Sequence, residues 1–449
     1  MTMKTDRPGW GERICFGAAG IGVRLVPSVI TGFMLIYLTN VAFLDVAACS
    51  AIIGVSKVFD GISDIVIGNI IDNTGSKLGK ARSWMLRMCL PLFVFAMLLF
   101  RVPPHMPQML KYVYVFVIYN IVNTGIITFT QISYYSMVSL ISDDRDEHVL
   151  LGSIVNLTRF VSVLMGSVVF VKLLDAFTDE PGNQNTQIAY TRSMILVCAA
   201  AVVLMLIAVA GTRERVQLSQ ERERKAPLKE LFAALKMLVS SRYWAVLIIM
   251  DILINIVLQF MATAVPYFSL YILHDMRYMS QILLTAMIPQ ILAALIIPAL
   301  TGRFGKRRVL IASLLTSIAG LIGIGMTSPA IKPLLAFNLL YGFGSGLVKG
   351  VSFILIADLV AYTEKTTGEF RPGTGNAGIS ASDKLGNGLG AVLFGFALST
   401  AGFDAALKVQ PAAVNSTISA MFIWVPALSF AAVLVIYILF FDIERIMNE

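Results

Sequence analysis

Two carboxylates, Asp60 and Asp64, lie four residues apart inside a mainly apolar segment, residues 46–71. The segment is long enough to cross a membrane, because a helical span needs roughly 20 residues. The i, i+4 spacing places both acids on one helix face. An ionised acid deep in a bilayer costs at least about 2.5–3.5 kcal/mol, so a positive charge has to compensate for it. We expect a bound cation or a shared proton; the alternative is a salt bridge to a neighbouring basic residue that only holds helices together.

The composition predicts what kind of element carries these acids. Of the 449 residues, 57% are hydrophobic and only 14% are charged, which is more apolar surface than a soluble domain can bury. We therefore predict an all-α polytopic protein of the cell (inner) membrane, surrounded by the lipid bilayer. The net charge of +8 does not indicate a nucleic-acid partner, because the basic residues occupy alternate loops and no nucleic-acid motif is present.

The sequence gives no sign of enzyme chemistry. The four cysteines lack CxxC spacing and the three histidines lie far apart, so neither a metal cluster nor a hydrolytic triad is indicated. The Walker pattern of phosphate-binding loops is absent, which argues against ATP-driven pumping. We predict a protein that is not an enzyme and that has no cofactor apart from a coupling ion.

Apolar runs between polar breaks predict about twelve spans. They begin near Ile14, Val46, Ser83, Leu110, Val149, Arg192, Tyr243, Ser280, Val309, Pro333, Gly375 and Ile418. A charged stretch, residues 212–242, separates the sixth span from the seventh, so we predict six-helix bundles over residues 1–211 and 243–449. A Gly-Lys-x-Arg match supports this division, because it follows the second span at Gly79 and the eighth at Gly305, about half a chain later.

The basic residues predict orientation and suggest a latch. Lys and Arg concentrate in one set of alternate connections, which places both termini in the cytoplasm. At the helix ends such residues can be topology signals alone. Because Asp72 can accept hydrogen bonds from them, we interpret four residues as a latch on the cytoplasmic side of a moving bundle. These candidate gating residues are Asp72, Lys80, Arg82 and Arg308.

Polar side chains inside other spans indicate a wet interior. Arg24 lies within the first span, where it either pairs with Asp60 or Asp64 or contacts a solute. In the fourth span a polar stripe recurs at i, i+4, i+7 and i+11. It consists of Thr124, Thr128, Gln131 and Tyr135. Ser and Thr often join membrane helices, but a whole stripe with adjacent aromatic rings fits the wall of a water-filled cavity better.

The fifth, seventh and eleventh spans also carry polar groups. Arg159 lies in the fifth, and the seventh has Asp251, Asn255 and Gln259 at helical spacing. In the eleventh, Ser380, Asp383 and Lys384 lie among many glycines, which let helices approach closely or bend. We expect Lys384 to be a counter-ion of Asp60 or Asp64, unless Asp383 or another acid holds it.

Residues 57–72, followed by residues 78–84, resemble the second-helix signature of the glycoside–pentoside–hexuronide:cation symporters, a family whose best-known member is the melibiose carrier. Further matches are residues 135–138 before the acidic loop 143–147, and residues 357–362 before residues 365–371. The resemblance covers essentially the whole chain. It implies a major-facilitator fold with twelve transmembrane helices in two six-helix halves, and symport of a small solute with Na⁺, Li⁺ or H⁺.

The resemblance also implies site residues. The family's cation site matches Asp60, Ser63, Asp64 and Thr128 here, so Asp60 and Asp64 would ligate the metal ion if the coupling ion is Na⁺. Tyr135 and Arg159 align with sugar-contacting positions, and Lys384 falls where the family carries a lysine. The predicted solute-binding set is Arg24, Gln131, Tyr135, Arg159, Ser380 and Lys384.

Two departures from the family concern the solute. Ile21-Gly22 replaces a Lys-Asp pair whose acid binds galactosides, and Gln131 replaces the second sugar-binding Asp. Positive charge remains at Arg24 and Arg159, and a guanidinium pairs well with a carboxylate. This pattern favours a hexuronide or another carboxylated solute over a neutral disaccharide.

We therefore predict a monomeric, cation-coupled symporter that imports a small polar solute such as a glycoside, pentoside or hexuronide. Two alternatives stay open at this point. One is a proton-coupled exporter of an amphipathic compound, for which a more aromatic and less polar cavity is expected. The other is a non-transporting membrane receptor on the same fold, which a gradient-dependent uptake assay would separate from a transporter.

Overall fold

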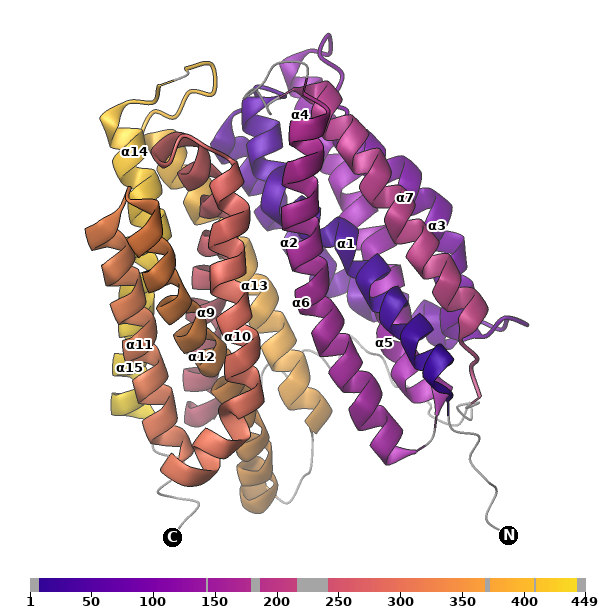
Figure 1. The fold of residues 1–449 in the computed structure, drawn as a ribbon. Helices are drawn as coiled ribbons and strands as arrows, with labels where there is room; N and C mark the ends of the chain where they lie inside the picture. The colour runs from indigo at the N-terminus through magenta and orange to yellow at the C-terminus, as the bar shows by residue number, and fades with distance from the viewer. Residues whose placement is uncertain are drawn as a thin grey trace, which may run out of the picture. The chain divides into compact units, whose positions relative to one another are not determined.

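The structure is a computed structural model that describes residues 8–142, 144–178, 186–215, 241–367, 372–407 and 409–441. In these residues the chain forms helices and no strand. It divides into two compact units, Met1–Arg224 and Lys225–Glu449. Within each unit the long helices run roughly parallel to one another (Figure 1). The predicted limits of the central loop stay a prediction, because most of that loop lies outside the described residues.

The first unit contains six long helical segments in its described part, and the fourth of them is interrupted by a π-helical turn, η1. The segments are α1 (Trp10–Asn40), α2 (Val46–Asp72), α3 (Lys80–Leu99), α4–η1–α5 (Gln108–Asn120, Ile121–Ile127 and Thr128–Ile141), α6 (Arg145–Ala176) and α7 (Gln187–Gly211). Helix α1 packs against α6 and α7, while α2 packs against the interrupted segment α4–η1–α5. This last contact positions the acids of α2.

The second unit also shows six long segments among its described residues, two of them with π-helical turns. They are α9–η2 (Arg242–Tyr267 and Phe268–Ile272), α10 (Arg277–Phe304), α11 (Lys306–Thr327), α12 (Ile331–Thr367), α13 (Pro372–Thr400) and α14–η3–α15 (Ala412–Ser419, Ala420–Trp424 and Val425–Phe440). Helix α12 packs on α10 and α11, and α9 packs on α13 and α15.

The helix lengths fit a membrane protein. Ten helices in the described part are long and apolar enough to span a bilayer. Helices α2 and α13 are not among the ten, but their 27 and 29 residues exceed the roughly 20 that a span needs. Both carry the charged residues that the sequence singled out. The predicted all-α class is confirmed, and the described segments are consistent with two six-helix halves.

Candidate functional site

Asp60 is held by the π-helical turn of the neighbouring segment. Its side chain projects from α2, and the residue is only 7% exposed. Asn123 donates its amide hydrogen to Asp60 Oδ2 over 2.7 Å, and Thr124 donates its hydroxyl to Oδ1 over 2.6 Å. Both carboxylate oxygens are therefore oriented by donors from η1. A carboxylate prepared in this way can bind a cation without rearranging its own hydrogen bonds.

The wide turn explains why two consecutive residues reach one carboxylate. A π-helical turn contains one residue more per hydrogen-bonded ring than an α-helix, and such turns are frequent at functional sites. The Thr128 hydroxyl donates to the backbone carbonyl of Asn123, five residues earlier, over 3.3 Å. The hydroxyl group that donates to Asp60 is thus that of Thr124, which lies one turn before the predicted Thr128. The assignment of Thr128 to the cation site stays a prediction.

Lys57 is the basic neighbour of Asp60 that the sequence analysis missed. Its ammonium lies 3.3 Å from Asp60 Oδ2, one helical turn earlier on α2, and both Asp60 and Asp64 act on it electrostatically. The i, i+3 spacing was the available signal. Asp64 is half-buried, and Ser63 donates its hydroxyl to the Asp60 backbone carbonyl over 3.1 Å. A coupling cation at this pair has to share it with Lys57.

Three predicted solute-binding residues come together elsewhere in the first unit. Arg24 of α1 donates to the Tyr135 hydroxyl over 2.5 Å, and its guanidinium lies 5.2 Å from the centre of the Tyr135 ring. Arg159 of α6 repels Arg24 electrostatically, so it lies in the same neighbourhood. Gln131, four residues before Tyr135 on α5, is half-buried. The side chain of Tyr135 is exposed, at 43%.

Of the two alternatives for Arg24, the pairing with Asp60 or Asp64 is not among the described contacts. In the described part of the chain the partner of Arg24 is Tyr135, and the cation beside Asp60 is Lys57. The physical reason is the packing of the helices: α1 brings Arg24 to α5 and α6, whereas Lys57 already lies one turn from Asp60 on the same helix. The other alternative, contact of Arg24 with a solute, stays a prediction.

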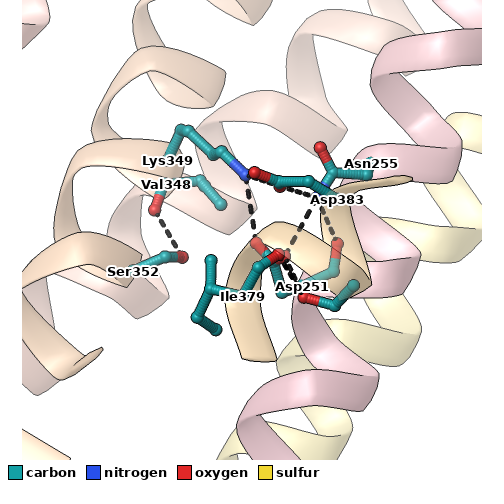
Figure 2. A network of polar contacts seen from close by, with 8 residues as sticks. Asp251, Asn255, Val348, Lys349, Ser352, Ile379 and Asp383 are labelled. Carbon is teal, nitrogen blue, oxygen red and sulfur yellow. Dashed lines mark hydrogen bonds and ion pairs between the residues drawn. The ribbon is translucent and has the colours of Figure 1, made fainter. Parts of the chain in front are cut away.

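The second unit contains an ionic network that joins three helices (Figure 2). Lys349 of α12 lies between Asp251 of α9, at 3.0 Å, and Asp383 of α13, at 2.9 Å. Asn255 donates to both acids, over 3.1 Å to Asp251 and 2.5 Å to Asp383. Ser382 donates its hydroxyl to Asp251 over 2.7 Å. The polar residues predicted in the seventh and eleventh spans, Asp251, Asn255 and Asp383, therefore contact one another.

Glycines of α13 allow this network to form. A Cβ on Gly386 would lie 2.7 Å from the Cβ of Asn255, and one on Gly390 would lie 2.8 Å from that of Gln259. Only residues without a side chain permit such an approach of α13 to α9. The predicted role of the glycine-rich stretch in close helix contact is therefore seen at these two positions. Lys384, next to Asp383, is half-buried and stays a predicted solute-binding residue.

Two of the candidate gating residues, Lys80 and Arg82, make contacts inside the first unit. The Arg82 guanidinium donates to the backbone carbonyl of Val209 at the end of α7. Glu214 accepts from the backbone N–H groups of Lys80 and Arg82, at 2.7 and 2.8 Å. Arg308 is exposed. The side chains of two predicted residues, Asp72 and Ser380, lie outside the described part of the structure.

In the second unit, the repeat of the Gly-Lys-x-Arg loop makes a different contact. Lys306 begins α11, and its ammonium contacts both carboxylate oxygens of Asp358, at 2.6 and 2.7 Å. The first unit instead uses an acid, Glu214, at the start of α3. The repeated sequence therefore attaches the third helix of each unit to a later part of the chain by different residue pairs.

The acids of α2 and their donors from η1 lie in long apolar helices, as expected for a membrane carrier. A family model described as MFS/sugar transport protein matches residues 15–445. The chain belongs to this family. The resemblance inferred from the second-helix signature is confirmed, and the protein is a multi-pass membrane transporter of the sugar-transport family.

Curated relatives extend over nearly the full chain. The isoprimeverose transporter of Lactiplantibacillus pentosus is 27% identical over 441 residues, which are 97% of this chain and 89% of the relative. The inner membrane symporter YicJ of Escherichia coli (strain K12) is 23% identical, covering 95% and 91%. The glucuronide carrier protein homolog of Escherichia coli (strain K12) is 25% identical, covering 83% and 80%.

Solved structures support the same fold. The crystal structure of the nucleoside transporter NupG matches with a TM-score of 0.65 at 13% identity, over 94% of this chain and 98% of NupG. At this identity the likeness concerns the fold alone. The relatives agree with the predicted function, symport of a small polar solute of the sugar type, and they favour it over the exporter alternative.

Proposed function

We propose that this member of the sugar-transport family imports a glycoside, pentoside or hexuronide together with a cation bound at Asp60 and Asp64. The observation that carries the proposal is the buried carboxylate of Asp60, whose two oxygens accept from Asn123 and Thr124 inside a spanning segment. The relative YicJ is named an inner membrane symporter. We extend that location to this protein, with both termini in the cytoplasm and a monomer as the working form.

The cation side of the mechanism follows from charge. Asp60 and Asp64 are two acids one helical turn apart, and among the described contacts the ammonium of Lys57 lies beside them. A Na⁺, Li⁺ or H⁺ entering the pair adds positive charge, which reduces the cost of holding two acids in the membrane interior. The cation-bound protein then accepts solute more readily, and cation and solute cross the membrane together by alternating access.

The solute side rests on Arg24, Tyr135 and Arg159. The Tyr135 hydroxyl can donate to a solute oxygen, and its exposed ring can stack on a sugar face. Two guanidinium groups in one neighbourhood repel each other unless an anion lies between them. A carboxylated sugar such as a hexuronide would supply that anion, and a relative with the name glucuronide carrier protein homolog supports this substrate class.

The test is Arg24→Gln in membrane vesicles with an imposed cation gradient. We expect the affinity for a glucuronide to fall about tenfold to a hundredfold, which corresponds to losing one charge-assisted hydrogen bond of about 1.5–3 kcal/mol, while cation affinity is unchanged. Arg87→Gln is the matched control, because Arg87 also stacks on an aromatic ring, that of Trp84, but on α3. Wild-type preference for uncharged glycosides over their uronates would contradict the anionic-solute proposal.

A further inference from the structure

A cavity lies at one end of three neighbouring helices of the first unit. The loop after α3 and the first turns of α4 and α7 enclose a volume of about 770 Å³, which is within the range of about 300–1,000 Å³ that is usual for small-molecule sites. Helices α3 and α7 pack side by side here (Figure 1). The described residues that line the cavity include neither the acid pair of α2 nor a predicted solute-binding residue. The cavity therefore has no role in the function proposed so far.

Three polar side chains of the cavity are used inside the protein. Gln187 and Thr191 of α7 donate to backbone carbonyls of the loop after α3, over 2.7 and 2.9 Å. Tyr114 of α4 donates its hydroxyl to a carbonyl in the last turn of α3 over 2.8 Å. These bonds attach the end of α3 to both neighbouring helices, so the wall of the cavity is fixed in place without a ligand.

The cavity also has two guanidinium groups. Arg101 lies in the loop after α3 and Arg192 on α7, and both residues are exposed. In the part of the chain that the structure describes, neither of them donates a hydrogen bond or forms an ion pair. Two positive charges at one cavity favour an anion, and a guanidinium matches the oxygen atoms of a phosphate group. The acids of the connection before α7, Asp179 and Glu180, lie outside the described residues.

The depth of the arginines is that of a lipid headgroup. Helix α7 has 25 residues and is about 38 Å long, so it spans nearly the whole bilayer of about 40–45 Å. Arg192 lies five residues after its first residue, or about 8 Å along the axis. Each polar layer of a bilayer is about 5–8 Å thick, because about 30 Å of the total is hydrocarbon. Arg192 therefore lies where the phosphate groups of phospholipids meet the hydrocarbon.

An apolar stripe leads from the cavity along α7. It consists of Ile188, which also lines the cavity, and of Leu196, Val203 and Ile207, each about half exposed. Together with Arg192 these residues recur at intervals of four and seven, so they share one face of the helix. Within a bilayer such a face is covered by acyl chains, which are as apolar as a leucine side chain.

The wall of the cavity favours a lipid over a free anion. Leu98, Pro103 and Pro104 line it without any polar side-chain group. A free phosphate ion would lose water against this wall without gaining a partner there. A phospholipid can place its phosphate at the arginines, its glycerol part against the apolar wall and an acyl chain on the apolar stripe. The combination of two cations with an apolar exit therefore fits a lipid.

We propose that this cavity binds the headgroup of an anionic phospholipid, with the phosphate at Arg101 and Arg192 and an acyl chain along the apolar stripe of α7. A zwitterionic lipid fits less well, because its own positive group is repelled by the two guanidinium groups. The binding is independent of the proposed symport. Only the choice of the outer leaflet rests on the proposed orientation of the termini.

The test is native mass spectrometry of the purified protein with added phosphatidylglycerol, phosphatidylcholine or glycerol 3-phosphate. We expect phosphatidylglycerol to bind most tightly, and its affinity to fall about thirtyfold in Arg101→Gln/Arg192→Gln, the loss expected for two basic residues at an anionic membrane surface. Arg101→Lys/Arg192→Lys should keep most of the affinity. Arg87→Gln/Lys332→Gln is the matched control, because it removes the same charge from exposed positions outside the cavity.

Fluorescence quenching locates the bound lipid. In Ile188→Trp, the added fluorescence should be quenched more strongly by phosphatidylglycerol with brominated acyl chains than by brominated phosphatidylcholine. Leu428→Trp is the control, because Leu428 is an exposed apolar residue of α15 in the second unit and should be quenched equally by both lipids. Equal quenching by both lipids at Ile188→Trp would contradict the proposed position of the acyl chain.

Three results of the binding experiment overturn the proposal. Equal affinities for the two lipids, or the same loss in the control variant, would indicate a general effect of charge. Displacement of the lipid by glycerol 3-phosphate at similar affinity would indicate a site for small anions. Binding that appears only in Asp179→Asn/Glu180→Gln would mean that these acids hold the arginines. A protein that binds the lipid but shows no gradient-driven uptake would contradict the proposed symport and leave the lipid site standing.

Discussion

At the scale of single residues, a carboxylate in a membrane is stabilised by the donors that surround it. Asp60 has an amide, a hydroxyl and an ammonium as donors, at 2.7, 2.6 and 3.3 Å. Asp64 lies one turn further along α2, and it also interacts electrostatically with the ammonium of Lys57. The two acids therefore have different surroundings: Asp60 is buried and fixed in place by these donors, and Asp64, which is half-buried, is the more accessible of the two to an incoming cation.

We predict that Asp64→Asn abolishes concentrative uptake while the protein still inserts into the membrane. The amide keeps the size of the side chain but cannot supply the negative charge that a cation needs. Uptake against a gradient in vesicles measures the effect, and Asp45→Asn is the control, because Asp45 only caps the start of α2. Accumulation by Asp64→Asn at the wild-type level would show that the acid pair is not the cation site.

A second prediction concerns Thr124→Val, which removes the hydroxyl from Asp60 without changing the side-chain shape. A hydrogen bond to a charged group contributes about 1.5–3 kcal/mol, so we expect cation affinity to change by about tenfold to a hundredfold. Cation titration of the purified protein gives the measurement. Thr130→Val serves as control, because the Thr130 hydroxyl donates only to the Ile127 carbonyl of its own segment. Equal effects of both variants would indicate general damage to the helix.

The sequence identified the acids more readily than their partners. Asp60 and Asp64 stand out because acids in an apolar run are rare, whereas Asp251 stands out by its helical spacing with other polar residues and Asp383 by its glycine-rich surroundings. Lys349 lies in an equally apolar run and was overlooked. Its role could not have been assigned in any case, because it depends on helices α9, α12 and α13 meeting at one point, and helical spacing describes one element at a time.

At the scale of elements, the apolar pattern predicts that residues 108–141 span the membrane but not that the segment contains a π-helical turn. One extra residue in a turn leaves the apolar content of the span unchanged, so hydropathy cannot reveal it. It does change which side chains share a face. For this reason the predicted stripe put Thr124 and Thr128 on one face and did not place Asn123 and Thr124 together on Asp60.

We predict that Arg82→Gln changes the balance between inward-open and outward-open states without altering solute selectivity. The Arg82 guanidinium holds the Val209 carbonyl at the end of α7, so its loss frees the junction between α3 and α7. Labelling of single cysteines from each side of the membrane measures the balance, and competition assays measure selectivity. Arg303→Gln, at the end of α10, is the control. A selectivity change with an unchanged balance would place Arg82 in recognition instead.

At the scale of the whole molecule, transport depends on the coupling between cation and solute. Because binding free energies are linked, the solute must tighten cation binding by the same factor as the cation tightens solute binding, typically about 5- to 150-fold. We expect calorimetric titrations with Na⁺ and a glucuronide to give one common factor in both orders of addition. In Thr124→Val the two factors should fall together. Unequal factors in the wild type would mean that the two ligands reach different conformations.

The π-helical turn η1 can connect cation binding at Asp60 to solute binding further along the same segment. It contains Asn123 and Thr124, which hold Asp60, and it precedes Gln131 and Tyr135, which we assign to the solute. Converting this turn into a regular α-helical turn would remove the extra residue from the ring and turn the helix beyond it by about 100° relative to the helix before it. A cation that pins Asn123 and Thr124 on Asp60 therefore sets the angle at which Tyr135 is presented. In the segment α4–η1–α5, cation binding can then be converted into a rotation of α5, which carries Gln131 and Tyr135.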